Sequence, residues 1–575
     1  MNQRSPDNRP TTIDVRWILI LVFVVGFVIR LAFTGLPRVA RWDEASYLAI
    51  ARSLLAGNGY IELSGVVDLQ QPPLVTMLAM VGLTLGLPLG WAAAGPAHVL
   101  LGSLVILPMY GLARELYGQR VGLLAALLGA TYPALAVSPL YWSTMTEPPY
   151  ALFVLTGLYA ALRCSQSLRG QAPGAGAPWG WAALMGGAFG LGYLVRPEAL
   201  VFLAVMLVYL GIIWLASGRR QLARLLASGA IAVAITALLA LPYVLYLHQA
   251  TGLWVISGKQ GVSMDIAWAY VNDSQTMHDQ AAASLDASGQ EILWLSPQAL
   301  HKSMTAWIAE DPRRFVILVR ANIRDMGKAL FHEDLFTPWI VALMALGLFG
   351  QPWTRTRWRR ELLLLMALAP LASIWVFFVL SRFLVVYVAI GLIWAAAGLA
   401  QISRWAADSG HDLLASPSAP ALTPGRRSVV DLLRVLPVAG TVTLLLLGGV
   451  TVAANELPRQ PFYHVEAGRW LAENVPAGSP IMTRNTDPTL YAGLPKVAFP
   501  NASWPEVLAY GQARGARYLV VNSWEIEGVR PYLAPLLTPE AGNLPPGLVF
   551  RHRIEGKERT VFIYEFVQDT GAAQD

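Results

Sequence analysis

Apolar runs long enough to cross the hydrocarbon core of a membrane recur along most of this chain of 575 residues. There are about eleven of them, and they lie near 17–33, 96–113, 120–138, 148–163, 179–195, 199–216, 222–247, 334–350, 361–380, 383–400 and 432–452. Hydrophobic residues make up 55% of the chain and charged residues only 14%, with a mean hydropathy of +0.48. The sequence therefore predicts a polytopic α-helical membrane protein and excludes a soluble enzyme.

The arginines and lysines cluster in the short segments between these runs. By the positive-inside rule such segments are cytoplasmic. The rule assigns to the cytoplasm the N-terminus and the basic loops near 114–120, 163–169, 219–224, 355–360 and 404–434. The formal net charge of +6 then reports topology and gives no reason to expect a nucleic-acid partner. We expect a multi-pass protein of the inner (plasma) membrane.

One further apolar run, Pro72 to Leu89, does not fit this alternation, because a crossing there would place Arg114 and Arg120 outside. We expect this run to dip into the outer leaflet or to lie along it. Residues 36–95 then form one long external loop within a transmembrane domain that covers 1–454.

Two adjacent carboxylates, Asp43 and Glu44, stand in this loop shortly after the first run, in RWDEASYLAIARSLLAGNGY. Apolar residues follow at helical spacing from Tyr47 to Leu55 and predict an amphipathic helix on the membrane surface. Paired carboxylates at a membrane exit favour chemistry such as proton abstraction. The alternative is that Asp43 only caps this helix by accepting N–H bonds at its N-terminus.

Further charged residues are predicted to face the same compartment. They are Glu147 in STMTEPP, Arg196 with Glu198 in LVRPE, Arg382 in SRF, and Lys259 in a long external stretch from about 248 to 331. Taken singly, each arginine could be an interfacial side chain, the lysine an ordinary loop cation and the glutamate a helix cap. Taken together, carboxylates and cations at one membrane face suit a phosphate-bearing lipid substrate.

Five segments carry a resemblance to a known family through their order and spacing. They are RWDEASYLAIARSLLAGNGY, QPPLVTMLAM, ARELYGQRVGLLAALLGATYP, STMTEPP and GLGYLVRPEAL, all between residues 41 and 200. In this order they resemble the bacterial dolichyl-phosphate-mannose protein mannosyltransferase-like group, the family 39-type enzymes of the GT-C superfamily, which also include the aminoarabinose transferases of lipid A. The resemblance implies transfer of a sugar from a polyprenyl-phosphate donor to a lipid, glycan or protein acceptor on the outer face of the membrane.

The resemblance also implies roles for individual residues. The catalytic base of the family carries over to Asp43, and a carboxylate that helps to shape its site carries over to Glu147. The aminoarabinose transferases have a lysine before the proline of the first loop, but this chain has Gln71, so the phosphate-binding cation must come from elsewhere. The candidate catalytic residues are Asp43, Glu44 and Glu147. The candidate substrate-binding residues are Arg196, Glu198, Arg382, Lys259, Arg52, Tyr47 and Pro72.

The chemistry of such a transfer explains these residue types. A carboxylate opposite the leaving phosphate can deprotonate the acceptor as it attacks, which inverts the anomeric centre. Glu44 or Glu147 could hold the acceptor, orient arginines or ligate a divalent cation. Because the carboxylates are dispersed along the chain, metal use stays open, and no other cofactor is expected.

The chain from 455 to 575 is typical of an external soluble α/β domain. GRWLAENVPAG and WPEVLAYGQARG predict helices, and the segments PIMTR, KVAFP, RYLVVNS, GLVFRHRI and RTVFIYEF predict strands. Asp487 and His464 in this domain are expected to be helix caps or surface residues. The preceding linker from Ala406 to Arg427 is rich in Pro, Ser and Ala and predicts a flexible cytoplasmic loop.

Two other classes of protein share some of these features. A secondary transporter or lipid flippase also carries ionisable residues in apolar surroundings, but places them near the bilayer midplane and often shows inverted repeats. An inactive scaffold with the same fold could keep Asp43 and Glu147 as helix caps. The carboxylates of this chain gather at one predicted face, which favours the enzyme.

Overall fold

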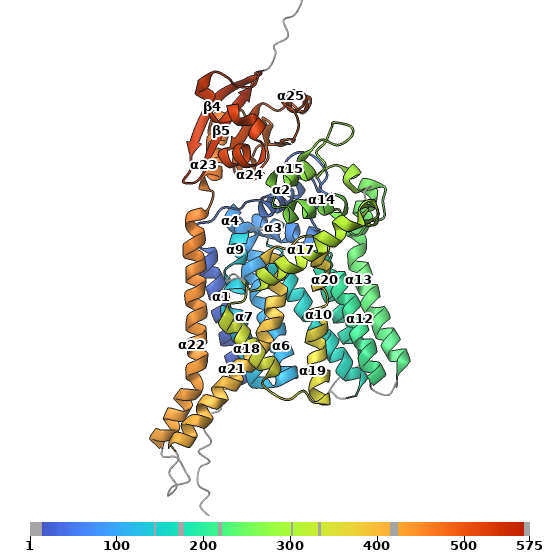
Figure 1. The fold of residues 1–575 in the computed structure, drawn as a ribbon, viewed down its shortest axis with the longest axis vertical. Coiled ribbons are helices and arrows are strands. Elements are labelled where there is room, and N and C mark those ends of the chain that lie inside the picture. The colour runs from blue at the N-terminus through green and yellow to red at the C-terminus, as the bar shows by residue number, and fades with distance from the viewer. Residues whose placement is uncertain are drawn as a thin grey trace, which may run out of the picture.

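The computed structural model describes residues 14–142, 145–170, 178–216, 221–300, 303–331, 335–414 and 424–567. It consists of a bundle of helices and a small domain with a β-sheet, which sits on one end of the bundle (Figure 1). This end is uppermost in Figure 1 and is here called the upper end. The architecture confirms the predicted class, a polytopic helical membrane protein with a C-terminal α/β domain.

Seven helices in the described part of the chain are long and apolar enough to cross a membrane. They are Val15–Thr34 (α1), Leu89–Tyr117 (α4 through α6), Glu147–Leu168 (α10), Ala199–Ala216 (α12), Leu222–Thr251 (α13), Ser381–Leu414 (ending in α21, Val385–Leu414) and Ser428–Arg459 (mostly α22, Pro424–Glu456). The apolar stretch that ends in α21 is 89% buried in the protein, and that of α22 only 17%. Helix α21 therefore forms the centre of the bundle and α22 an outer edge.

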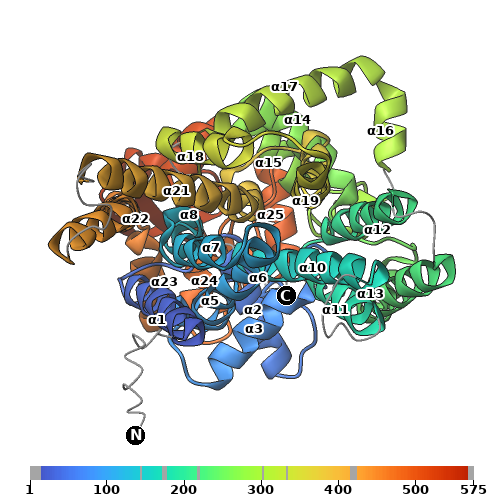
Figure 2. The same cartoon turned by 90° about the horizontal axis from the view of Figure 1, so that it is seen from below.

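Four other predicted spans are helical but shorter. They are α7 (Gln119–Thr131), α11 (Pro178–Tyr193), α18 (Pro338–Phe349) and α19 (Arg355–Met366), which stand among the long helices (Figures 1 and 2). The predicted run 361–380 is not one helix. It is interrupted before α20 (Leu371–Trp375), because Pro370 has no N–H to donate and its ring disfavours a continuous helix.

The predicted flexible linker is shorter than expected. Helix α21 continues to Leu414 and α22 begins at Pro424, so helices cover both ends of the predicted 406–427 loop. Its middle part, 415–423, lies outside the described residues.

A buried arginine joins α1 to α7 inside the bundle. Arg30 has an exposure of 0%, and its guanidinium donates to the carbonyls of Gly26, Gly129 and Leu135 at 3.0, 3.0 and 3.3 Å. The last carbonyls of an α-helix have no partner within the helix, and α7 ends at Thr131, just before Pro133. Arg30 therefore satisfies backbone groups that a membrane interior would leave unpaired.

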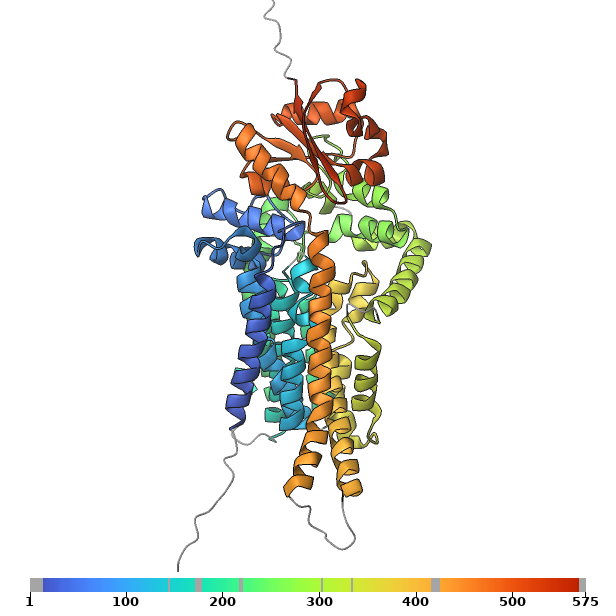
Figure 3. The same cartoon turned by 90° about the vertical axis from the view of Figure 1, so that its left-hand side faces the viewer.

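Helices that are not among the membrane spans crowd the upper end of the bundle, beneath the C-terminal domain (Figures 1 and 3). They include α2 (Asp43–Leu55), α3 (Pro73–Thr84), α14 (Gln260–Val271), α15 (Gln275–Ala283), α16 (Met304–Glu310) and α17 (Pro312–Leu330). Helix α3 has 12 residues, about 18 Å of helix, which is too short for a hydrocarbon core of about 30 Å. Gly90, which follows it, accepts a bond from Arg38 Nε at 3.0 Å in the segment that leads into α2, so the chain stays at the upper end.

The C-terminal domain is built on a five-stranded sheet of order β2-β1-β3-β5-β4. Its strands are β1 (Ile481–Thr483), β2 (Lys496–Ala498), β3 (Tyr518–Asn522), β4 (Leu548–Glu555) and β5 (Thr560–Phe566). Strand β1 runs parallel to β2 and β3, and β5 runs antiparallel to β3 and β4. All five predicted strands are confirmed.

Helices of this domain pack on both faces of the sheet. They are α23 (Phe462–Asn474), α24 (Asp487–Ala492) and α25 (Trp504–Ala513), of which α23 and α25 were predicted and are confirmed. Side chains alternate along a strand, so Leu519 and Val521 of β3 enter one core with α25, and Tyr518 and Val520 enter the other with α23.

Candidate active site

Helix α2 presents Asp43 and Tyr47 on one face, because residues four positions apart lie on the same side of an α-helix. Trp42 is the N-cap residue and Asp43 is the first residue of the helix, so Asp43 does not occupy the capping position. The side chain of Asp43 is 36% exposed, whereas Tyr47 is buried. Asp43 therefore remains accessible to a ligand.

Arg382 faces Asp43 from a distant part of the chain. It lies in the short 3₁₀ turn Ser381–Leu384 that precedes α21, and its Nη1 is 3.4 Å from Asp43 Oδ2. Among the described residues, no group of the protein accepts a hydrogen bond from its buried Nε. Buried donors are nearly always paired, so Arg382 has hydrogen-bonding capacity to offer a substrate.

Arg196 and Glu198 lie in the turn between α11 and α12. Arg196 Nη2 is 3.4 Å from Glu198 Oε1, and the guanidinium lies 4.2 Å from the ring centroid of Phe383 and 5.6 Å from that of Tyr150. Burial acts to lower the pKa of Arg196, but the carboxylates of Glu198 and Glu147 raise it overall. In the described part of the chain, Glu198 Oε2 is buried and accepts no hydrogen bond.

The hydroxyl of Tyr47 lies close enough to four charged residues for their charges to act on it. Its pKa is raised by burial and then by the carboxylates of Asp43 and Glu147, while Arg382 and Arg196 act in the opposite direction. Glu147 is the first residue of α10 and is 2% exposed. The structure thus brings Asp43, Tyr47, Glu147, Arg196, Glu198 and Arg382 together at the upper end of the bundle.

Lys259 joins this group from the N-terminus of α14, where it is the N-cap residue. Burial lowers the pKa of its ammonium, the carboxylate of Asp43 opposes that effect, and the guanidiniums of Arg196 and Arg382 reinforce it. The position of Lys259 depends on its neighbour Gly258, which packs against the backbone of Leu69. A Cβ atom at Gly258 would lie 1.7 Å from the Leu69 carbonyl oxygen.

Replacement of Gly258 by Ala is expected to destabilise the protein and displace Lys259, because backbone atoms must move to admit the methyl group. Overpacking of this kind typically costs about 1–3 kcal/mol. Thermal unfolding of the purified protein, followed by tryptophan fluorescence, measures the loss. Gly211→Ala is the control, because nothing lies within 4 Å of its added Cβ, and its melting temperature should not fall. An equally stable Gly258→Ala protein would contradict the close packing.

The donor atoms of the site do not fit a divalent cation. Asp43 and Glu198 each face a guanidinium, whereas a hard cation needs several oxygen ligands that converge on one point. Within the described residues, no three His, Cys, Asp or Glu side chains are grouped in this way.

The structure places Glu44 away from this group. Glu44 is 0% exposed, accepts from Arg38 Nη1 at 2.9 Å and forms a second bond with Arg38 Nη2. Arg38 also donates to the carbonyls of Gly90 and Leu140. Successive residues of an α-helix point about 100° apart, so Glu44 faces the bundle while Asp43 faces the site.

Two other residues predicted to bind substrate, Arg52 and Pro72, also have structural roles. Arg52 lies on the side of α2 opposite Asp43 and donates to the Leu490 carbonyl of the C-terminal domain at 2.7 Å. Pro72 is the N-cap residue of α3, and the Leu74 N–H donates to the Leu194 carbonyl at 3.0 Å, two residues before Arg196. Leu74, two residues after Pro72, thus joins the start of α3 to the turn that carries Arg196.

Several residues of this region escaped the sequence prediction. Arg38 could have been inferred from the need of a buried glutamate for a cation, but Phe383 and Tyr150 carry no comparable signal. Asp487 and His464, expected to be caps or surface residues, are 1% and 5% exposed. His464 Nδ1 and Asp487 Oδ2 are 2.7 Å apart, and Asp487 Oδ1 accepts from the Trp42 N–H at 3.2 Å.

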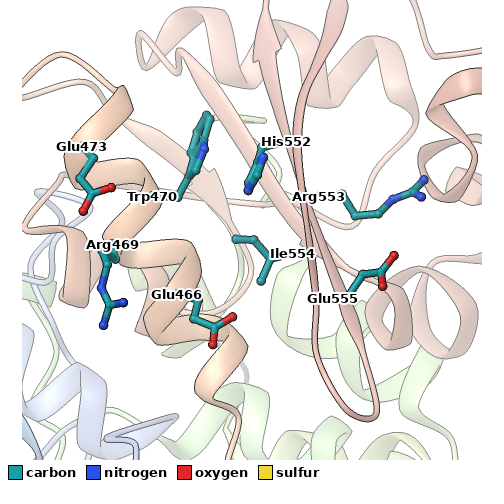
Figure 4. Close-up of a pocket in the computed structure, with 8 residues that line it drawn as sticks. All are labelled: Glu466, Arg469, Trp470, Glu473, His552, Arg553, Ile554 and Glu555. Atoms are coloured by element: carbon teal, nitrogen blue, oxygen red, sulfur yellow. The ribbon is translucent and has the colours of Figure 1, made fainter.

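A separate groove of about 370 Å³ lies on the C-terminal domain, between α23 and β4 (Figure 4). It is lined by Glu466, Arg469, Trp470, Glu473, His552, Arg553, Ile554 and Glu555, and the rings of Trp470 and His552 are stacked at 5.0 Å. The groove shares no residue with the charged group around Asp43.

The chain was compared with known protein families, curated sequences and solved structures. The sequence profile of the dolichyl-phosphate-mannose-protein mannosyltransferase family matches residues 70–246. No curated protein sequence matches the chain significantly.

Solved structures match almost the whole chain. ArnT from Cupriavidus metallidurans in the apo state gives a TM-score of 0.57 at 16% identity, with 96% of this chain and 98% of that chain covered. The same protein bound to undecaprenyl phosphate gives 0.55 at 15% identity, with the same coverage of 96% and 98%. The archaeal oligosaccharyltransferase AglB from Archaeoglobus fulgidus, in complex with an inhibitory peptide and a dolichol-phosphate, gives 0.55 at 15% identity, over 94% and 73% of the two chains.

These likenesses show the fold alone: the chain has the architecture seen in solved GT-C membrane glycosyltransferases. The resemblance predicted from the sequence, to the dolichyl-phosphate-mannose protein mannosyltransferase-like group, is confirmed by the match over 70–246.

Proposed function

We propose that the protein is a membrane glycosyltransferase that moves a sugar from a polyprenyl-phosphate-linked donor to a lipid, glycan or protein acceptor, with Asp43 as the general base. One observation carries this proposal. At one end of the bundle, the accessible carboxylate of Asp43 lies 3.4 Å from Arg382, and the charges of Asp43, Arg196 and Arg382 all act on the ammonium of Lys259. The solved relatives hold undecaprenyl phosphate and dolichol-phosphate, which supports a lipid phosphate as the carrier.

The proposed reaction breaks the bond between the anomeric carbon and the phosphate oxygen. The phosphate leaves with the electron pair, an acceptor oxygen or nitrogen forms the new bond to carbon, and Asp43 takes the acceptor proton. The transition state has oxocarbenium character, as in glycoside hydrolysis. Attack from the side opposite the phosphate inverts the anomeric centre.

The cations and the remaining carboxylates have complementary parts in this reaction. Negative charge grows on the leaving phosphate, and donors already held in place stabilise it without reorganisation. The buried Nε of Arg382 is one such donor, and Lys259 supplies the charge that Gln71 cannot. Glu147 and Glu198 hold Arg196 in its charged form, and Glu198 Oε2 is available to a sugar hydroxyl.

A panel of radiolabelled polyprenyl-phosphate sugars tests the proposal. The purified protein is incubated with each donor and with membrane extract, and the label is followed into lipid, glycan and protein fractions. We expect one donor to lose its label to one fraction, which identifies the sugar and the acceptor together. Label that moves no faster than with boiled protein, for every donor of the panel, would overturn the proposal.

Replacement of Arg196 by Ala, or of Lys259 by Met, is expected to raise the donor concentration at half-maximal rate by about 10- to 100-fold. Hydrogen bonds to charged groups contribute about 1.5–3 kcal/mol, and their loss weakens donor binding. Rates measured against donor concentration give this value. Arg320→Ala, at an exposed position of α17, is the control and should match the unmodified protein. Unchanged donor dependence in both variants would remove these cations from the site.

We further propose that the site and the C-terminal domain lie on the extracytoplasmic side of the inner (plasma) membrane. The basic loops predict this orientation. In this orientation the site would be open to a donor and an acceptor outside the cytoplasm. The external segment 36–95 and the domain 455–575 would then share one compartment.

Cysteines introduced at Ser46 and Ser503 in a Cys164→Ser background are expected to react with an impermeant thiol reagent on intact cells. Cys164 is buried, and Ser503 is exposed on the C-terminal domain. Gln119→Cys, at the opposite end of the bundle, should react only after the membrane is permeabilised. A labelled Gln119→Cys protein on intact cells, or only one labelled serine position, would contradict the orientation.

A further inference from the structure

The segment that leads into α2 is held by side chains of the C-terminal domain. The Val39 N–H donates to Gln460 Oε1 at 3.0 Å, the Ala40 N–H to the Tyr491 hydroxyl at 2.9 Å, and the Trp42 N–H to Asp487 Oδ1 at 3.2 Å. Three of four successive backbone donors thus find their acceptors in a domain that begins more than 400 residues later.

Trp42 needs such support because its backbone is strained. Its φ is +52° and its ψ −128°, a conformation that residues with a side chain rarely adopt. Strain of this kind costs about 1–3 kcal/mol and persists only where the surroundings impose it. Trp42 directly precedes Asp43, so its torsion angles set where α2 begins and where the Asp43 carboxylate points.

Asp487 is itself fixed in position. It is 1% exposed, and its second oxygen is 2.7 Å from Nδ1 of His464, a buried residue of α23. Each carboxylate oxygen therefore has a separate partner, the imidazole on one side and the Trp42 N–H on the other. The imidazole orients Asp487, and Asp487 orients the backbone of Trp42.

The same short helix, α24, also reaches the far end of α2. Leu490 of α24 accepts from Arg52 at 2.7 Å, and Arg52 lies in the last turn of α2. Together with Asp487 and Tyr491, this bond holds α2 near both of its ends. Helix α2 therefore cannot shift along its axis or rotate without loss of contacts to the C-terminal domain.

A second contact fixes the orientation of the C-terminal domain relative to the bundle. Asp279 of α15 accepts from Arg484 Nε at 2.8 Å and from Arg530 Nε at 3.0 Å, and both Asp279 and Arg530 are buried. Buried charge pairs are costly to separate. The domain is thus anchored to helix α15 as well as to the segment before α2.

We infer that the C-terminal domain positions the general base, with Asp487 and His464 as positioning residues that act on Asp43 through the backbone of Trp42. The inference rests on the proposed function of Asp43. A misplacement of about 1 Å at a reacting group can cost about 100-fold in rate. Loss of the Asp487 carboxylate is therefore expected to lower the rate at saturating donor and to leave the donor concentration at half-maximal rate unchanged.

The experiment compares Asp487→Ala with Asp487→Asn in the full-length protein. Asp487→Ala removes the acceptor of the Trp42 N–H and should lower the rate at saturating donor about 10- to 100-fold. Asn keeps the size of the side chain and an oxygen that can accept from the Trp42 N–H, so most of the rate should return. Glu527→Gln, an exposed carboxylate of the same domain, is the matched control and should leave the rate unchanged.

Amide hydrogen exchange gives a readout that does not depend on turnover. In Asp487→Ala, peptides that cover 39–45 should exchange faster, while the sheet of the C-terminal domain stays protected. Tyr491→Phe is the milder second variant, since it removes only the hydroxyl that accepts from Ala40, and it should give a smaller change in the same peptides.

The outcomes separate this inference from the proposed function. Unchanged exchange at 39–45 in both variants, or an Asp487→Ala rate equal to that of the unmodified protein, would overturn the positioning role. If Asp43→Asn is inactive in the same assay, the proposed function stands even then. If the unmodified protein transfers no sugar at all, the proposed function fails, and the positioning role, which rests on it, falls with it.

Discussion

Replacement of Asp43 by Asn is expected to lower the rate of sugar transfer by about 10²- to 10⁴-fold, the usual contribution of a positioned general base. The amide keeps the size of the carboxylate and can still accept a bond from Arg382, which lies 3.4 Å away. It cannot take a proton from the acceptor. Donor binding should not weaken, because the neutral side chain no longer repels the donor phosphate.

The same variant tests the capping alternative in solution, although Trp42 and not Asp43 is the N-cap residue of α2. Asn caps a helix as well as Asp does, so a protein in which Asp43 served only as a cap would remain stable and active after this replacement. Transfer rates and donor dependence of the purified variant decide between the two. Glu147→Gln is the comparison, because loss of that carboxylate should weaken substrate positioning more than it slows turnover. A folded Asp43→Asn protein with nearly normal transfer would remove the central claim.

Replacement of the adjacent Glu44 by Ala is expected to lower the free energy of unfolding by about 3–5 kcal/mol. This is the usual cost of removing one partner of a buried ion pair. Arg38 would then be left charged in a site where its side chain is only 2% exposed. Its remaining bonds, to the carbonyls of Gly90 and Leu140, do not neutralise it. The melting temperature of the purified protein measures the loss.

Two further variants complete this test. The double variant Arg38→Met with Glu44→Leu should recover much of the stability, because apolar side chains of similar volume often replace a buried ion pair without cost. Arg551→Ala is the matched control, since its pair with Glu565 is exposed, and exposed pairs contribute about 0–1 kcal/mol. A Glu44→Ala protein that melts normally but transfers no sugar would instead make Glu44 a catalytic residue.

Much of the fold could be predicted because its causes are local. Long apolar runs specify membrane helices, and the alternation of apolar residues in RYLVVNS and RTVFIYEF specifies strands. The interruption of the 361–380 run could also have been inferred, since Pro370 stands inside it. The extension of α21 to Leu414 could not, because Ala, Ser and Asp in the predicted linker permit both helix and loop.

The site was harder to predict because it depends on contacts between distant segments. Asp43 and Arg382 are 339 positions apart, and only their shared membrane face connects them in the sequence. Asp43 and Glu44 cannot be told apart as residue types. Their difference arises from the turn of the helix, which directs one to an open site and the other to Arg38. Arg52 was assigned to substrate for the same reason, since the sequence does not reveal that α24 lies behind α2.

The bonds that hold the segment before α2 also constrain the order in which the protein is completed. They join residues 421, 451 and 445 positions apart. Helix α2 is among the first helices to be synthesised, yet its partners in α24 (Asp487–Ala492) follow after all the membrane spans of the described chain. Contacts over such separations form slowly, because the intervening chain must be ordered first. One of the earliest helices to be made is thus among the last to reach its final place.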